Sequence, residues 1–168
     1  MGRRVPGPTA LIRYQRALGF TPSAGEKSRL GPLPQHFADR FGWHELTEEV
    51  ARIYGALPEE ERASAAIVTR NYGEAGAIDY YGRPHRLPAA RSPHNSYYFW
   101  GPGRERPSVV ILVGWSTEEI TSSWTQVEVA GRLESPYAMP FETGSPIHVC
   151  RGLKVPLETA WRRAKMFI

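Results

Sequence analysis

The chain has 168 residues, of which 41% are hydrophobic and 23% are charged, and its formal net charge is +4. This composition is typical of one folded globular domain and argues against wholesale disorder. The single cysteine, Cys150, excludes an intrachain disulfide and a metal site built from cysteines alone. The longest apolar run, Val109–Val113, is far shorter than the roughly 20 residues that a membrane-spanning helix needs.

The two ends of the chain carry many of its basic residues, including Arg3, Arg4, Arg162 and Arg163. Such ends are suited to an anionic surface, but a solvated surface is the simpler interpretation. No nucleic-acid-binding motif is present, so we expect no nucleic-acid partner. The N-terminus also lacks the apolar stretch of a secretory signal, so the sequence predicts neither export nor insertion on its own information.

Residues 1–35 are rich in proline and glycine, and we expect them to form an arm or linker with a short helix over Leu11–Leu18. Residues 36–168 are expected to form a single α/β domain. Its first element is a helix that begins near Trp43 and ends before Pro58. The apolar residues of this helix share one face: Trp43, Leu46, Val50, Ile53, Tyr54 and Leu57.

The remaining elements alternate between strands and helices. Apolar or alternating runs predict strands over 65–69, 108–114, 125–130 and 146–151. Helices are expected over 74–81, over 118–124 and after Pro156. The run at 108–114 is apolar without alternation, which predicts a strand covered on both faces, whereas 125–130 alternates like a strand nearer an edge. We therefore expect a small three-layer, Rossmann-like α/β sandwich, with a mostly parallel sheet of four to five strands and helices on both faces.

Ligands of open α/β sheets bind at the carboxyl ends of the strands, which directs attention to the loops there. The first such loop contains Asn71, Tyr72, Gly73, Glu74 and Gly76. Glycines at a helix start let backbone N–H groups approach a phosphate, but Glu74 places a negative charge at that point. A tight turn with close helix packing and a contact to a neutral polar ligand, such as a sugar hydroxyl, remain as alternatives.

The second loop holds His94, Asn95 and Tyr97 within an aromatic run that continues to Trp100. Aromatic faces beside amides suit sugar rings, which offer both C–H faces and hydroxyls. The alternative is that the aromatic residues belong to the core and that His94 and Asn95 form structural hydrogen bonds.

The third loop, 137–142, contains Glu142, which could pair with Glu74 as two carboxylates in one site. His148 and Cys150 would share one face of a strand, but a buried thiol is the simpler interpretation because no third orienting group is apparent. No motif for a metal, a serine nucleophile or a nucleotide is present. We therefore predict no cofactor, no metal and no catalytic residue in this chain.

Six segments carry a resemblance to a known family. They are FADRFGW at 37–43, LPEEER at 57–62, NYGEAGAID at 71–79, HNSY at 94–97, YFWGP at 98–102 and PYAMPFE at 136–142. In this order they resemble the C-terminal extracytoplasmic domain of bacterial family 39 membrane glycosyltransferases, which are similar to dolichyl-phosphate-mannose protein mannosyltransferases. The resemblance spans about residues 10–165.

The resemblance implies a parent enzyme that transfers a sugar from a polyprenyl-phosphate carrier. Because the acidic catalytic residues of that family lie in its membrane half, none is carried over to this chain. The expected function is a non-catalytic recognition domain that contacts a polyprenyl-phosphate-linked sugar or a glycan acceptor, or that assembles with a membrane subunit. Its location would be the extracytoplasmic face of the membrane, or the cytoplasm if the chain stands alone.

Two other functions remain open. One is a soluble α/β enzyme that binds a sugar phosphate or a nucleotide at Gly73–Gly76, and the other is a docking domain without a small-molecule ligand. The predicted ligand-binding residues are Asn71, Tyr72, Gly73, Glu74, Gly76, His94, Asn95, Tyr97 and Glu142.

Overall fold

The computed structural model describes residues 7–20, 31–103 and 107–167. The α-helices are α1 (Pro8–Ala17), α2 (Gln35–Ala38), α3 (Trp43–Ala56), α4 (Glu59–Arg62), α5 (Tyr72–Tyr81), α6 (Thr117–Thr121) and α7 (Leu157–Ala164), and η1 (Asn95–Trp100) is a 3-10 helix. The strands are β1 (Ala66–Thr69), β2 (Val109–Val113), β3 (Trp124–Arg132) and β4 (Pro146–Leu153). None of the described helices has both the length and the apolar character required to cross a bilayer.

The four strands form one mixed sheet in the order β1-β2-β4-β3. The pair β1 and β2 is parallel, with Ala66 opposite Val110, whereas β4 runs antiparallel to both β2 and β3. The expectation of a mostly parallel, Rossmann-like sheet is therefore wrong. The physical reason is the connection over 133–145, which contains turns but no helix. A parallel neighbour requires a long crossover across one face of the sheet, so the chain returns beside β3 in the opposite direction.

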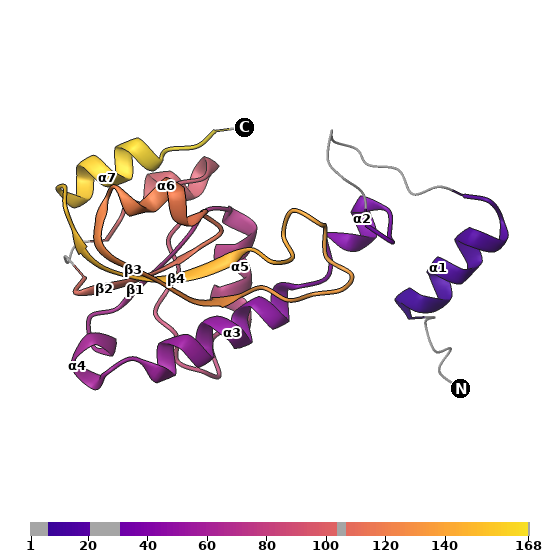
Figure 1. Cartoon of the computed structure of the whole chain (residues 1–168), viewed down its shortest axis with the longest axis horizontal. Helices are drawn as coiled ribbons and strands as arrows, with labels where there is room; N and C mark the ends of the chain where they lie inside the picture. The colour runs from indigo at the N-terminus through magenta and orange to yellow at the C-terminus, as the bar shows by residue number, and fades with distance from the viewer. Residues whose placement is uncertain (1–6, 21–30, 104–106, 168) are drawn as a thin grey trace.

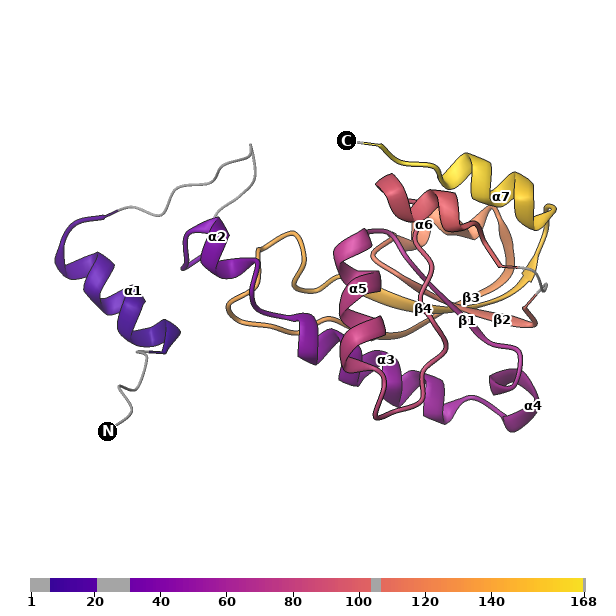
Figure 2. The same ribbon diagram turned by 180° about the vertical axis from the view of Figure 1, so that it is seen from behind.

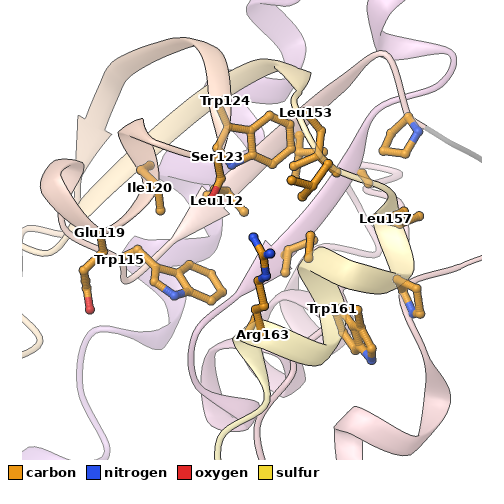
Figure 3. Close-up of a pocket in the computed structure, with 18 residues that line it drawn as sticks. Leu112, Trp115, Glu119, Ile120, Ser123, Trp124, Leu153, Leu157, Trp161 and Arg163 are labelled. Atoms are coloured by element: carbon orange, nitrogen blue, oxygen red, sulfur yellow. The ribbon is translucent and has the colours of Figure 1, made fainter.

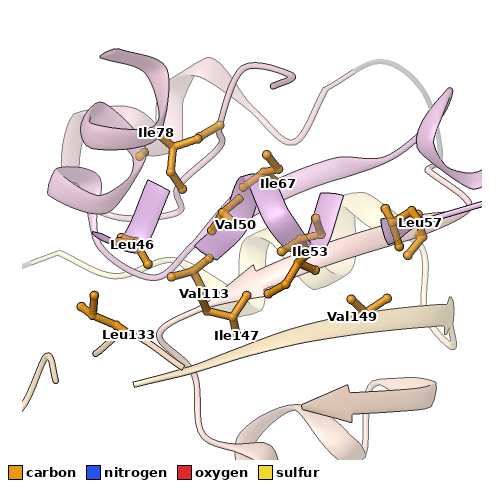
Figure 4. Packing of buried hydrophobic residues seen from close by; sticks show 14 residues of the cluster. Leu46, Val50, Ile53, Leu57, Ile67, Ile78, Val113, Leu133, Ile147 and Val149 are labelled. Atoms are coloured by element: carbon orange, nitrogen blue, oxygen red, sulfur yellow. The ribbon is translucent and has the colours of Figure 1, made fainter. Parts of the chain in front are cut away.

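One face of the sheet is covered by α3 and α5, and this interface contains the largest core (Figure 4). Leu46, Val50 and Ile53 project from α3 and pack with sheet residues such as Ile111 and Ile147. The predicted helix is confirmed, because its apolar residues recur with the period of one helix face. All five residues of β2 are buried, as the unbroken apolar run predicted.

The opposite face carries a smaller cluster of buried residues: Val110, Leu112, Ile120 and Cys150. Figures 1 and 2 show α6 and α7 on this side of the sheet and α3 on the other. Helices thus cover both faces, and β3 is an edge strand, as its alternating pattern predicted.

The N-terminal elements pack away from the sheet, at the end reached by the 133–145 connection (Figures 1 and 2). Leu33 and Met139 are buried in a third cluster, against which Leu11 and Ile12 of α1 pack. None of the residues of α1 is itself buried. The predicted arm therefore contains a short helix that rests on the connection, and the division of the chain at residue 35 stays a prediction.

Candidate functional site

A cavity of about 280 Å³ with several polar and charged residues in its wall lies at the edge of the sheet where β1 and β2 end and β4 begins. Its wall is drawn from segments far apart in the sequence: Arg70, Asn71, Glu74, His94, Gly114, Phe141, Glu142, Ser145 and Met166. Four of the predicted ligand-binding residues, Asn71, Glu74, His94 and Glu142, thus come together around one space. We call it the Glu74–Glu142 cavity.

The turn from β1 into α5 places two of these side chains. The Gly73 N–H donates to Asn71 Oδ1 at 2.6 Å, and the Asn71 N–H donates to Glu74 Oε2 at 2.9 Å. This reciprocal pair is a capping box, which satisfies backbone donors that a helix start leaves free. Its signature, Asn followed three residues later by Glu, is visible in the sequence and indicates why Glu74 turns back toward β1.

Gly73 serves close packing in this turn. A Cβ atom added to Gly73 would lie 3.1 Å from the Trp43 ring, whereas one added to Gly76 would meet the Tyr97 hydroxyl at an ordinary contact distance of 3.8 Å. The Gly73 N–H is already used by Asn71, and the Tyr72 N–H points at the His94 ring. Two backbone donors that a phosphate would need are therefore occupied, which favours the close-packing interpretation over the nucleotide one.

The two carboxyl groups of the cavity titrate above their ordinary range. Burial raises the pKa of Glu74 to about 7; the Asn71 N–H opposes this shift and the nearby charge of Glu142 adds to it. Burial also raises the pKa of Glu142, although its Oε2 accepts the Met139 N–H at 3.3 Å. Near neutral pH the Glu74 carboxyl can therefore donate or accept a proton within the cavity.

His94 supplies an imidazole to the same wall and is only 1% exposed. Its Nδ1 accepts the Tyr72 N–H at 3.4 Å, which places the ring proton on Nε2. Nε2 is buried and has no hydrogen-bond partner in the part of the chain that the structure describes. Burial lowers the pKa of His94, so the ring is held neutral with one unused N–H donor.

Arg70 also lines the cavity, but its charge is already paired. Arg70 Nη1 donates to both carboxylate oxygens of Glu119, at 2.9 Å and 2.8 Å. The cavity is therefore acidic, with no unpaired arginine or lysine among its lining residues.

Gly114 also lines the cavity and has a φ of +91°. A Cβ atom added there would lie 3.0 Å from Arg70 and from Glu74, so a larger residue would collide with both.

The other predicted residues lie outside the cavity wall. Tyr72 is exposed and packs its ring 4.9 Å from that of His94, and Tyr97 packs against the core. The Asn95 N–H donates to the Met166 carbonyl at 2.9 Å, which brings the C-terminal tail beside His94. The sequence offered no signal for Gly114, Ser145 or Met166, because only the fold brings their segments to this edge.

The His148–Cys150 pair is confirmed as two buried residues on one face of β4. Burial raises the pKa of Cys150 to about 12, so its thiol is protonated and unreactive. His148 Nε2 instead lies 2.9 Å from Thr117 Oγ1. Among the residues that the structure describes, no group of three or more His, Cys, Asp or Glu could hold a metal ion.

Comparisons with protein-family models, with curated proteins and with solved structures give no match for this chain. The family 39 resemblance therefore stays an expectation.

Proposed function

We propose that this chain is a recognition domain that binds one neutral sugar ring of a glycan in the Glu74–Glu142 cavity, without turnover. In this proposal it serves as the accessory domain of a polyprenyl-phosphate-sugar-dependent membrane glycosyltransferase. The observation that carries the proposal is the lining itself, which combines two carboxyl groups and a neutral imidazole with no unpaired cation.

Sugar hydroxyls both donate and accept hydrogen bonds, and this lining offers partners of both kinds. The carboxyl oxygens of Glu142 accept, and the Glu74 carboxyl, whose pKa burial raises to about 7, donates when it is protonated. Phe141 lines the cavity and is 58% exposed, so the face of its ring suits the C–H surface of a sugar ring.

A phosphate is a poorer ligand here. The carboxylate of Glu142 would repel it, and Arg70 is already committed to Glu119. A nucleotide or sugar phosphate would also have to displace the capping contacts of Asn71. These observations favour the recognition domain over the soluble enzyme that binds anions.

The proposal is tested by saturation-transfer NMR of the whole chain. The ligands are mannose, glucose, galactose and N-acetylglucosamine, together with the sugar phosphates and the nucleoside-diphosphate sugars derived from them. We expect weak binding of at least one neutral sugar, and Glu142→Gln should weaken it about tenfold by replacing a charged acceptor. Glu60→Gln, an exposed substitution on α4, is the matched control and should bind like the unaltered chain.

Tighter binding of a phosphate or nucleotide than of any neutral sugar would contradict the proposal. Equal binding by Glu142→Gln would also contradict it, because the sugar would then occupy another place. Release of nitrophenol from nitrophenyl glycosides would contradict only the statement that the domain is non-catalytic.

A further inference from the structure

A second, larger cavity of about 410 Å³ lies on the opposite side of the sheet, between the face that carries Leu112 and helix α7 (Figure 3). Apolar side chains dominate its wall. Prominent among them are Leu112, Trp115, Trp124, Leu157 and Trp161. Its volume falls within the range of small-molecule sites, which runs from roughly 300 to 1,000 Å³.

Contacts of Trp161 anchor α7 to η1. The Trp161 indole N–H donates to the Tyr98 carbonyl at 3.1 Å, and the two rings stack with centroids 5.9 Å apart. In Figure 3 the Trp161 ring accordingly points away from Leu112. The α7 residues that do face the sheet include Ala160 and Ala164, which are too small to fill the space.

Arg163 is exposed to solvent and places a positive charge beside this apolar space. Figure 3 shows its side chain extending from α7 between Leu112, Trp115 and Leu157. In the described part of the chain no carboxylate lies within ion-pair distance of Arg163. The one acidic residue of the wall, Glu119, is already bound by Arg70 and by the Ser116 N–H.

We propose that this cavity binds a single apolar chain that ends in a carboxylate, that is, a fatty acid. The hydrocarbon chain of the fatty acid would lie against Leu112, Trp115 and Trp124, where burial of apolar surface favours binding. The carboxylate would accept hydrogen bonds from the Arg163 guanidinium, whose planar donors match a carboxylate.

The composition of the wall argues for this occupant over a peptide. An inserted peptide would bury backbone N–H and C=O groups, and the wall offers few polar partners besides Arg163, Ser123 and the committed Glu119. A neutral hydrocarbon would leave Arg163 unused. The proposal concerns a separate cavity on the other face of the sheet, so it does not depend on the sugar site.

The test is a titration of the whole chain with saturated fatty acids from octanoate to palmitate, below their micelle concentrations, followed by tryptophan fluorescence. Since three tryptophans line the cavity, we expect a saturable change at one ligand per chain. Arg163→Gln should weaken fatty acid binding about tenfold by removing a charged hydrogen bond, yet leave binding of the alcohol of equal chain length unchanged. Arg162→Gln, on the same helix but outside the wall, is the matched control.

Ala160→Phe fills the cavity and should abolish binding of both the acid and the alcohol; Ala164→Leu repeats the test if the first variant is misfolded by circular dichroism. The proposal is overturned if no fatty acid gives a saturable change, or if Arg163→Gln binds the acid as the unaltered chain does. It is equally overturned if an alkyl phosphate binds more tightly than the carboxylate of the same length.

Discussion

Glu74 has two roles in this molecule. Its carboxylate closes the capping box of α5 through the Asn71 N–H, and the same group lines the Glu74–Glu142 cavity. The surrounding protein raises its pKa from the ordinary 4.5 to about 7 because burial disfavours the charged form. The folded chain therefore binds this proton more tightly than the unfolded chain does.

A raised pKa makes stability depend on pH in a defined direction. The stabilisation that Glu74 contributes is complete below about pH 4.5 and is lost as the pH rises through 7. We expect the loss to reach about 3 kcal/mol in the free energy of unfolding. Glu74→Gln should remove this dependence, since the Gln oxygen still accepts the Asn71 N–H.

Urea denaturation from pH 4.5 to above pH 7 measures the free energy of unfolding of the unaltered chain and of Glu74→Gln, with Glu60→Gln as the control. A Glu74→Gln variant that loses stability as steeply as the unaltered chain would show that Glu74 titrates normally.

Helix α5 shows how local hydrogen bonds set an element. The helix begins at Tyr72 because Asn71 and Glu74 satisfy its first free N–H groups. The same arrangement, formed by Ser116 and Glu119, begins α6, but there the hydroxyl accepts the Glu119 N–H at the longer distance of 3.4 Å. The first box holds Glu74 in the wall of the Glu74–Glu142 cavity, and the second holds Glu119 in the wall of the apolar cavity.

Asn71→Ala should therefore cost about 1 kcal/mol in the free energy of unfolding, which urea denaturation measures. Asn71→Ser keeps a capping oxygen and should recover most of that loss. Ser116→Ala, at the start of the five-residue α6, should cost less. If Asn71→Ala is as stable as the unaltered chain, the capping bond contributes nothing to stability.

At the scale of the whole molecule, the chain is unevenly packed. Every residue of β2 is buried between two layers of helices, whereas α1 contains no buried residue and only rests on the cluster around Met139. Regions with few buried contacts open at a lower free energy than the core does.

Hydrogen exchange followed by mass spectrometry should therefore give the slowest exchange in peptides covering Val109–Val113 and the fastest, among the helices of eight or more residues, in α1. The predicted order follows from burial alone. Protection of α1 equal to that of β2 would show that the N-terminal helix belongs to the cooperative core.

The accuracy of the sequence predictions follows the range of the interactions involved. The helix at Trp43–Ala56 and the strand at Val109–Val113 were predictable because their apolar spacing lies within a few residues. The start of α5 was equally readable from Asn71 and Glu74, although only the turn was predicted and not its capping box. The direction of β4 was predicted wrongly. A parallel sheet was expected from the alternation of strands and helices, but no helix lies between β3 and β4.

By itself, the sequence determined the helices of eight or more residues, the four strands, the two-sided burial of β2 and the absence of an intrachain disulfide, because composition and short-range periodicity decide these features. Only the tertiary structure decided that β4 returns antiparallel between β2 and β3, and that Glu142 and Met166 reach the cavity of Glu74. It alone also decided that α7 holds Arg163 over an apolar space. These features depend on which distant segments pack together, and no local pattern encodes that choice.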